Sequence, residues 1–298
     1  MDRFEIFQPI PESELILNSD GSVYHLRLRS EQLANTVILV GDPGRVVQVS
    51  ERFDRIEERV SSREFITHTG EYKGQRISCV ATGIGADNID IVLNELDALV
   101  NIDLDSRVPK TNTASLQLVR IGTTGALHAD IPVGAWILSD WAIGLDGLIN
   151  WYNGKFNPAE VNMVHEFIRH SAYPNILAQP YAVQADADLL QKFRTSTIAG
   201  ITLTSPGFYA PQGRKLRLAS QFPDLNERMS SFRHEQLRVT NFEMETSGLY
   251  SLGKTLGHKC ASVCMVMANR SQLKINPSPQ QSMGNLIEFV LDSLTKPR

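Results

Sequence analysis

The amino-acid sequence predicts an α/β fold, in which helices cover a β-sheet. Short apolar runs alternate along the chain with amphipathic segments of helix length, which is the pattern of such a fold. The chain has 298 residues, of which 42% are hydrophobic and 21% charged, so it resembles ordinary globular proteins and can bury a large core. Because no stretch reads as a linker, we expect a single domain spanning residues 1–298.

The strands of the sheet are expected where the apolar runs are short. In chain order these runs span residues 36–41, 76–82, 117–123, 135–139, 181–184, 197–204, 237–241 and 259–267.

Helices are expected between the strands, over residues 87–100, 157–170, 186–193, 244–256 and 281–294. The first begins at Asp87 or Asn88, either of which can cap a helix, and it carries an apolar stripe. The second begins at Asn157, a capping residue followed by Pro158, which is tolerated in the first turn. Gly257 ends the fourth helix.

Three segments lack a regular pattern. Residues 101–113 and 150–157 are expected to be surface excursions. Residues 1–22 carry two prolines and little periodicity, so we expect an extended arm that wraps a neighbouring subunit.

The net charge of −4 argues against a nucleic acid or a membrane surface as partner, because both require a basic face. No stretch approaches the roughly 18 apolar residues of a membrane helix, and the first residues lack the order of a secretory signal. We therefore expect a cytoplasmic protein. A small anionic substrate would need local arginines.

The three cysteines, Cys79, Cys260 and Cys264, lie in apolar surroundings, and they are expected to be reduced thiols that pack in the core. No second Cys or His pair accompanies Cys260 and Cys264, so no metal site is expected there. His165 and His170 resemble part of a zinc-protease helix, but they are five positions apart, so on a helix they point in different directions.

At two strand ends the sequence combines glycine with arginine, a combination that suits the binding of an oxyanion. The run 37–40 breaks at Gly41 and delivers Arg45, so that backbone N–H groups and a guanidinium face the same space. Arg120 lies inside an apolar run before Gly122, and burying a guanidinium without a partner is unfavourable. Its partner is either a bound anion or an internal carboxylate. The segment 41–44 lacks the glycine spacing of a dinucleotide site.

Two further segments carry groups that can recognise a nucleobase and a sugar. Gln212 offers a donor and an acceptor side by side, which matches the edge of uracil, and Arg214 suits a carbonyl that becomes negative. Glu243 and Glu245 can accept from sugar hydroxyls. Taken alone, Gln and Arg in a Gly/Pro-punctuated loop more often face water.

Together these motifs resemble, in their order along the chain, those of the nucleoside phosphorylase superfamily with a single-domain fold, and within it the uridine phosphorylases. The motifs are 41–45 (Gly-Asp-Pro-Gly-Arg), 62–65 (Ser-Arg-Glu-Phe), 82–85 (Thr-Gly-Ile-Gly), 120–125 (Arg-Ile-Gly-Thr-Thr-Gly), 208–214 (Phe-Tyr-Ala-Pro-Gln-Gly-Arg), 242–245 (Phe-Glu-Met-Glu) and 269–270 (Asn-Arg). The resemblance implies a three-layer α/β/α fold with a central mixed, partly barrel-like sheet. Purine-specific members place an Asp where this chain has Asn269, which disfavours purines.

The resemblance also implies roles for particular residues. Phosphate would be held by Gly41, Arg45, Arg120, Thr123 and, from a neighbouring subunit, Arg63. Ribose would be held by Glu245, Met244, Thr123 and the neighbour's His25, and the base by Phe208, Gln212 and Arg214, with Arg270 supporting their loop. Arg120, Arg214, Gln212 and Glu245 would act in catalysis. Sites shared across an interface imply at least a homodimer, and the family also forms hexamers.

The implied reaction is the reversible phosphorolysis of uridine to uracil and ribose 1-phosphate, with phosphate as the attacking group and without metal or organic cofactor. This chain departs from the family pattern at residues 86–88 (Ala-Asp-Asn). The resemblance therefore defines the subunit interface less closely. With Asn88 at this position, no monovalent cation is expected near Glu64. The alternatives are a purine-directed phosphorylase or nucleosidase of the same superfamily, and a non-catalytic nucleoside-binding module.

Overall fold

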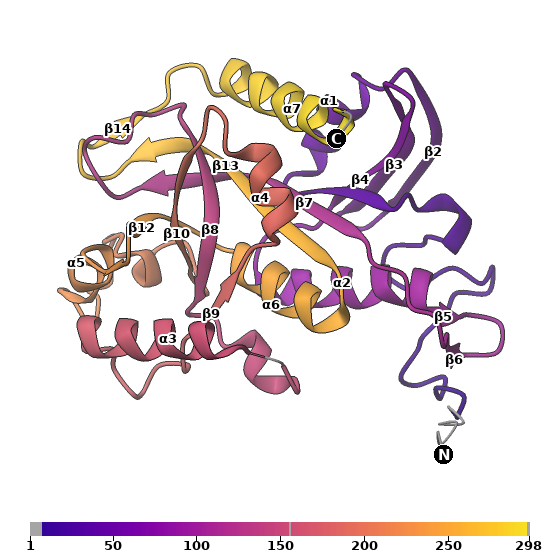
Figure 1. Ribbon diagram of the computed structural model, residues 1–298, viewed down its shortest axis with the longest axis horizontal. Coiled ribbons are helices and arrows are strands. Elements are labelled where there is room, and N and C mark those ends of the chain that lie inside the picture. The colour runs from indigo at the N-terminus through magenta and orange to yellow at the C-terminus, as the bar shows by residue number, and fades with distance from the viewer. Residues whose placement is uncertain (1–7, 155, 297–298) are drawn as a thin grey trace.

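The computed structural model describes residues 8–154 and 156–296. It is a mixed α/β fold in three layers, as the sequence predicts, with helices on both sides of a central sheet (Figure 1). The first seven residues of the predicted N-terminal arm lie outside the described part. Between Gln8 and Ser22 the chain forms turns and an isolated bridge from Leu17 to Val23, and Ile10 N donates to Arg107 O.

The main sheet has the strand order β11-β12-β10-β8-β13-β7-β1-β4-β3-β2, with β9 paired to β8 and β14 to β13. Its strands are β1 (Thr36–Val40), β2 (Arg55–Ser62), β3 (Phe65–Tyr72), β4 (Gln75–Ala81), β7 (Gln117–Ala126), β8 (Trp136–Gly144), β9 (Tyr181–Gln184), β10 (Ile198–Thr204), β11 (Arg233–His234), β12 (Leu237–Glu243), β13 (Lys259–Asn269) and β14 (Lys274–Ile275).

One part of this sheet closes on itself. β7 pairs in parallel with β13 and also antiparallel with β12, so β7, β13, β8, β10 and β12 form a ring. Register shifts after Gly200, Ile201 and Val266 interrupt the ladders within this ring. Such irregularities bend and twist strands, which a sheet needs in order to close. The expected partly barrel-like sheet is confirmed.

The helices are α1 (Pro43–Ser50), α2 (Ala86–Asn101), α3 (Pro158–Ser171), α4 (Ala187–Phe193), α5 (Leu225–Ser230), α6 (Thr246–Leu256) and α7 (Pro279–Thr295). Figure 1 shows α1 and α7 on one side of the sheet and α2 and α6 on the other. Asn157 caps α3 as expected: its Oδ1 accepts from Glu160 N, while Glu160 Oε2 accepts from Asn157 N. Gly257 ends α6 in the left-handed conformation, at φ 89°.

Several elements were not predicted from the sequence, and the predicted start of α2 was wrong. The hairpin of β2 and β3 was not predicted, because β2 alternates exposed and half-buried residues and has no buried apolar run. Neither α1 nor the short α5 was predicted. The N-cap of α2 is Gly85, whereas Asp87 or Asn88 was expected. The excursion 101–113 contains the small hairpin of β5 (Ile102–Asp103) and β6 (Val108–Pro109), and a 3₁₀ turn, Leu148–Trp151, runs into the excursion 150–157.

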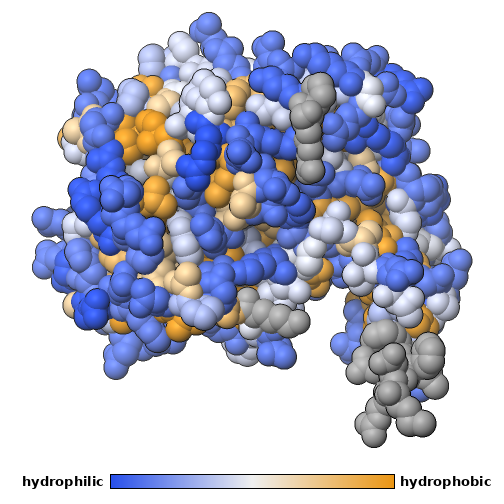
Figure 2. All heavy atoms as spheres, viewed as in Figure 1, coloured by the Kyte–Doolittle hydropathy of each residue, from blue (hydrophilic) through white to orange (hydrophobic). Residues whose placement is uncertain are grey.

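Two main buried apolar clusters, and a third of four buried residues, stabilise the described part of the chain. The larger main cluster surrounds β1, β4 and β7 and includes residues of α2 and α7, and the smaller main cluster lies among β8, β10, β12, α3 and α5. The face shown in Figure 2 is mostly hydrophilic, and hydrophobic side chains reach it in separate patches. No helix among the described residues is long and apolar enough to cross a membrane.

Candidate active site

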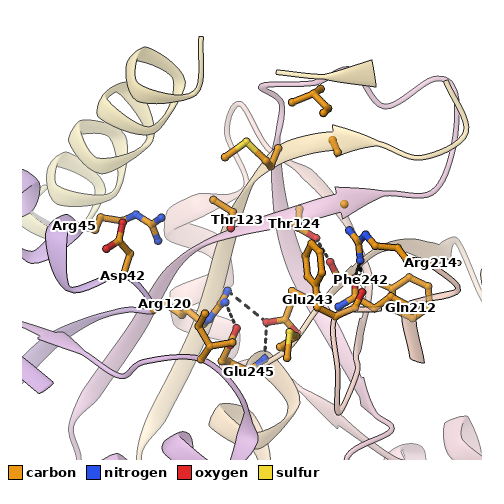
Figure 3. A pocket seen from close by; sticks show the side chains of 18 residues that line it. Asp42, Arg45, Arg120, Thr123, Thr124, Gln212, Arg214, Phe242, Glu243 and Glu245 are labelled. Atoms are coloured by element: carbon orange, nitrogen blue, oxygen red, sulfur yellow. Dashed lines mark hydrogen bonds and ion pairs between the residues drawn. The ribbon is translucent and has the colours of Figure 1, made fainter. Parts of the chain in front are cut away.

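A cavity of about 450 Å³ opens where the segments after β1, β10 and β12 meet β7 and β13. Nine of the predicted site residues line it: Gly41, Arg45, Arg120, Thr123, Phe208, Gln212, Arg214, Met244 and Glu245. We call it the active-site cavity. Figure 3 shows Arg45 near one end and Arg214 near the other, with Arg120, Glu243 and Glu245 between them.

The first end of the cavity is cationic. β1 ends before Gly41, and Asp42 then caps α1, since its Oδ1 accepts from Gly44 N at 2.9 Å and Pro43 occupies the first turn. Arg45 follows in that turn, and its Nη1 donates to Ile121 O at 3.3 Å. Burial lowers the pKa of Arg45, and the neighbouring charge of Arg120 lowers it further. Two adjacent cations in a partly buried place favour an anion between them.

Arg120 projects from the middle of β7 and is 4% exposed. Its Nη2 donates to Glu245 Oε2, and its Nη1 lies 2.9 Å from Cys264 Sγ and 3.4 Å from Glu243 Oε2. Burial alone would lower the pKa of Arg120, but Cys264 and the carboxylates of Glu245 and Glu243 raise it overall. Of the two partners that the sequence left open for this guanidinium, the structure shows the internal carboxylates.

Glu245 is buried at the centre of the cavity wall, where α6 begins. Its Oε1 accepts from Gly85 N at 2.8 Å, so the loop after β4 also holds it. Burial raises the pKa of Glu245, while Arg120 opposes that rise. One carboxylate thus faces both a cation and the cavity, where it could accept a hydroxyl hydrogen bond.

Glu243 was named in the sequence motif but was given no site role by the resemblance. Its Oε2 accepts from Glu245 N at 3.0 Å, Thr246 N at 2.8 Å and Thr246 Oγ1 at 2.8 Å, and its Oε1 accepts from Thr204 Oγ1 at 2.5 Å. A carboxylate at the N-terminus of α6 is favourable because the helix exposes unpaired N–H groups there. Glu243 therefore fixes the backbone of Glu245 and supports Arg120.

The second end of the cavity is built by the loop after β10, which contains a 3₁₀ turn, Ala210–Gln212. Gln212 is 2% exposed, and its Oε1 accepts from Arg214 Nη1 at 2.5 Å. The Arg214 guanidinium lies 3.7 Å from the centre of the Phe208 ring, and Nη1 also donates to Phe208 O at 2.6 Å. Burial and the nearby Arg270 lower the pKa of Arg214.

Arg270 supports this loop, because its Nη1 donates to Gln212 O. Asn269, the preceding residue, does not line the cavity: its Nδ2 donates to His128 O at 2.8 Å and to Ile131 O at 2.7 Å. At the position where the resemblance implies an acid in purine-specific relatives, this chain therefore has an amide that holds a neighbouring loop.

Two predicted site residues, His25 and Arg63, do not line the cavity of their own chain. His25 Nδ1 lies 2.6 Å from Glu95 Oε1, and Arg63, in the turn between β2 and β3, lies over the Tyr24 ring at 5.5 Å. Arg63 lines a separate, polar surface pocket with Asn18, Tyr24, Arg27 and Ser62. Their contribution to the site of a neighbouring subunit stays a prediction.

Nine further lining residues were given no role in the site by the resemblance, although some of them, such as Thr124 and Glu243, lie in the motifs that carry it. They are Asp42, Ile84, Thr124, Gly125, Phe242, Glu243, Met267, Ala268 and Ile275. Most are neighbours of predicted residues along a strand or turn, but Met267 and Ala268 come from β13 and Ile275 from β14, and no local pattern distinguishes them from core residues. Among the described residues, no cluster of three or more His, Cys, Asp or Glu could hold a metal ion.

Comparison with known proteins assigns the chain to a family. A model of the phosphorylase superfamily matches residues 35–290. A uridine phosphorylase of Thermococcus kodakarensis is 32% identical over 257 residues, which is 84% of this chain and 79% of that protein. A uridine phosphorylase of Escherichia coli is 27% identical over 92% of this chain and 98% of its own length.

Among solved structures, a Trypanosoma brucei nucleoside phosphorylase described as showing uridine phosphorylase activity is 27% identical to this chain and superposes with a TM-score of 0.82. That match covers 94% of this chain and 99% of the other. With a family model that spans most of the chain and a relative above 30% identity, this chain belongs to the phosphorylase superfamily.

Proposed function

We propose that this protein is a uridine phosphorylase, which converts uridine and inorganic phosphate reversibly into uracil and ribose 1-phosphate. The observation that carries the proposal is one cavity with Arg45 at one end, Gln212 and Arg214 at the other, and Arg120 and Glu245 between them. Three relatives of this chain named uridine phosphorylase or described with that activity support the choice of substrate.

In this proposal phosphate occupies the cationic end. Arg45 is held there by the first turn of α1, and Thr123 and Gly41 line the same cavity. Arg120 would exchange part of its contact with Glu245 for a phosphate oxygen, and Glu245 would then accept from the ribose hydroxyls. Charge-assisted hydrogen bonds of this kind are the stronger ones in proteins.

The base would lie against Phe208, with its edge on Gln212 and Arg214. As the bond from C1′ to N1 of uridine breaks, its electron pair moves onto uracil, and a phosphate oxygen forms the new bond to C1′. The uracil anion then takes a proton from solvent. Arg214 and Gln212 donate to the oxygen that becomes negative, so they stabilise the transition state more than the substrate.

The proposed reaction needs neither a metal nor an organic cofactor, since phosphate supplies the attacking atom. We also propose that a second copy of the chain completes the site with Arg63 and His25. Three guanidiniums around one dianion suit phosphate.

The test is the fall in ultraviolet absorbance that accompanies conversion of uridine to uracil, measured with purified protein with and without phosphate. We expect loss of uridine only with phosphate, and little reaction with inosine. Equal rates without phosphate would mean hydrolysis, and preference for inosine would mean a purine-directed enzyme. A rise in melting temperature with uridine, without formation of uracil, would mean a binding module.

A further inference from the structure

The ring of strands closes at a short seam between β7 and β12. The backbone ladder of this seam pairs Asn241 with Ala126 and Phe242 with Gly125, whereas β7 pairs with β13 along its whole length. Gly125 and Phe242 also line the active-site cavity. Because the ladder is so short, side-chain contacts between β7 and β12 carry a large share of the pairing at this wall of the cavity.

One buried amide bonds across the seam. Asn241 is fully buried and does not line the cavity. Its Nδ2 donates to Thr124 Oγ1 at 2.7 Å, and Thr124 Oγ1 donates to Phe242 O at 2.6 Å. Figure 3 shows Thr124 next to Phe242. A carbonyl oxygen only accepts, so the single hydroxyl proton of Thr124 is used there and Asn241 has to be the donor to Thr124.

The oxygen of the same amide bonds to β10. Asn241 Oδ1 accepts from Thr202 Oγ1 at 3.0 Å and from Thr240 Oγ1 at 2.7 Å. Thr202 is the register partner of Asn241, and the next pair on this face is Thr204 with Glu243, whose Oγ1 and Oε1 are 2.5 Å apart. Asn241 thus joins β12 to both of its neighbours in the ring, β10 and β7.

The seam lies between the two substrate positions of the proposed reaction. β7 carries Arg120 and Thr123, which would hold phosphate, and the segment after β12 carries Met244 and Glu245, which would hold ribose. Attack on C1′ requires the two substrates to be aligned, and an error of about 1 Å in such an alignment can lower a rate about a hundredfold. The geometry of the seam therefore affects the rate of the reaction more than the binding of either substrate.

A second link between the same strands changes during the proposed reaction. The ion pairs of Arg120 with Glu243 and Glu245 also join β7 to the end of β12. With phosphate bound, Arg120 would give part of its contact with Glu245 to a phosphate oxygen, so this link becomes weaker. The hydrogen bonds of Asn241 lie outside that exchange and are kept.

We propose that Asn241 is a positioning residue of the active site. By holding the end of β12 on β7 and β10, it keeps the carboxylate of Glu245, and with it the ribose, at a fixed distance from the phosphate on Arg120. Asn241 touches neither substrate and acts through the backbone of β12. The inference rests on the proposed function, because it concerns the alignment of uridine with phosphate.

Steady-state kinetics of Asn241→Leu test this role. Leu has the same branching as Asn and makes no hydrogen bond, while Thr240 Oγ1 keeps its contact with Ile201 O and Thr202 Oγ1 its contact with Ser139 Oγ. We expect kcat for uridine to fall about tenfold, and KM for uridine and KM for phosphate each to change less than about twofold. An unaltered kcat, or a loss confined to either KM, would overturn the proposal.

A second variant tests the same hydrogen bond from β7. Thr124→Val keeps the shape of the side chain but removes the acceptor for Asn241 Nδ2 and the donor to Phe242 O. It should lower kcat about five- to tenfold. Because the two residues act through one hydrogen bond, the double variant should lose little more than the larger single loss. Losses that multiply in the double variant would refute the proposal.

Asn101→Leu is the control for a general loss of stability. Asn101 is also buried, and its amide holds the segment between α2 and β7: Nδ2 donates to Asp97 Oδ1 at 2.6 Å, and Oδ1 accepts from Ala114 N at 2.6 Å. This variant should lower Tm, as Asn241→Leu does, but keep the wild-type kcat well below its Tm. Equal falls of kcat in both variants would assign the effect to destabilisation and contradict a positioning role.

Hydrogen exchange separates this proposal from the proposed function. The N–H groups of Glu245 and Thr246 donate to Glu243 Oε2, so they report whether the start of α6 is held in place. Relative to the amides of β1, these two should exchange at least about tenfold faster in Asn241→Leu than in the wild type, and Asn101→Leu should keep the wild-type ratio. An unchanged ratio in Asn241→Leu would refute the proposal. If the wild-type protein converts no nucleoside, the proposed function fails, whereas exchange still decides whether Asn241 holds the end of β12.

Discussion

The buried guanidinium of Arg120 donates to the thiol of Cys264 across two adjacent strands, with 2.9 Å between Nη1 and Sγ. β13 runs parallel to β7, and its register pairs Ser262 with Arg120 and Cys264 with Gly122. The thiol therefore contacts Nη1 of the guanidinium, whereas Glu245 accepts from Nη2. The sequence indicates only a core-packing role for Cys264. In the structure this residue also helps to orient Arg120, the central cation of the candidate active site.

Replacing Cys264 by Ala should remove this contact and leave one N–H of Arg120 without an acceptor. We expect kcat/KM for phosphate to fall about three- to tenfold, which corresponds to the loss of one hydrogen bond, while Cys264→Ser stays near the wild type. Steady-state kinetics at varied phosphate measure the effect. Cys260→Ala is the matched control, because Cys260 is also buried on β13 but lies opposite Leu118 of β7. Equal losses in both alanine variants would assign the effect to packing.

Arg214→Ala should reduce kcat/KM for uridine by an amount equivalent to about 2–4 kcal/mol, as for the loss of an oxyanion-type donor. The guanidinium stacks on Phe208 and donates to Gln212, so its removal also releases the amide that would grip the base. Arg217→Ala, at an exposed position of the same loop, is the control and should have little effect. An unchanged rate in Arg214→Ala would remove this residue from the site.

Glu243→Gln should lower the free energy of unfolding by about 3 kcal/mol, the range expected when a buried charge pair loses a partner. The new amide group would place donors opposite the N–H groups of Glu245 and Thr246, which now donate to Glu243 Oε2. Urea unfolding measures the loss. Glu288→Gln changes an exposed carboxylate and should stay within about 0.5 kcal/mol. If the two variants were equally stable, Glu243 would not support the start of α6.

His68 should make the protein less stable in mild acid. Burial, followed by the charge of Arg59, lowers the pKa of His68 below its ordinary value of 6.5, and Ser50 Oγ lies 2.7 Å from its Nδ1. Protonation is therefore harder in the folded state. The contribution of His68 to the free energy of unfolding is complete above pH 6.5 and is lost as the pH falls through the folded-state pKa.

Urea unfolding at several pH values on either side of 6.5 measures this dependence. In His68→Gln the loss of stability toward acid should be smaller than in the wild type. His165→Gln, at an exposed position, should keep the wild-type dependence. The same pH dependence in all three proteins would assign the acid sensitivity to other groups.

The sequence predicts those parts of the site that lie close together along the chain. Gln212 and Arg214 belong to one loop, and Met244 and Glu245 to one strand end, so their joint placement needs only local structure. The contacts of Glu243 with Thr204 and of Arg120 with Cys264 depend on the pairing of distant strands, which no local pattern specifies.

For the fold, too, the sequence predicts some elements and not others. Buried strands such as β1 and β13 have apolar runs and were expected, whereas β2 is half-exposed along its length and forms because β3 pairs with it. Helix α3 carries its own capping box, but α5 is six residues long and depends on packing in the smaller core cluster. Local sequence patterns thus predict the elements that carry their own apolar run or capping residues, whereas tertiary contacts determine the others.

If a second copy of the chain completes the active site, two inactive variants should regain activity when they assemble with each other. Arg45→Gln removes a cation of the cavity, and Arg63→Gln removes the one proposed to come from the neighbouring chain. In a mixed dimer, the Arg63→Gln chain supplies an intact cavity and the Arg45→Gln chain supplies an intact Arg63, so one of the two sites is complete. Random assembly of equal amounts should then give about one quarter of the wild-type activity.

The measurement is uridine phosphorolysis by the two variants refolded together, compared with each refolded alone. Arg45→Gln mixed with Arg214→Ala is the control, because both residues line the same cavity of one chain, and their mixed dimer contains no complete site. Recovery in the first mixture but not in the second would show that Arg63 acts in the partner's site. Activity of Arg63→Gln alone near the wild-type level would contradict a shared site, since the cavity would then bind phosphate without it.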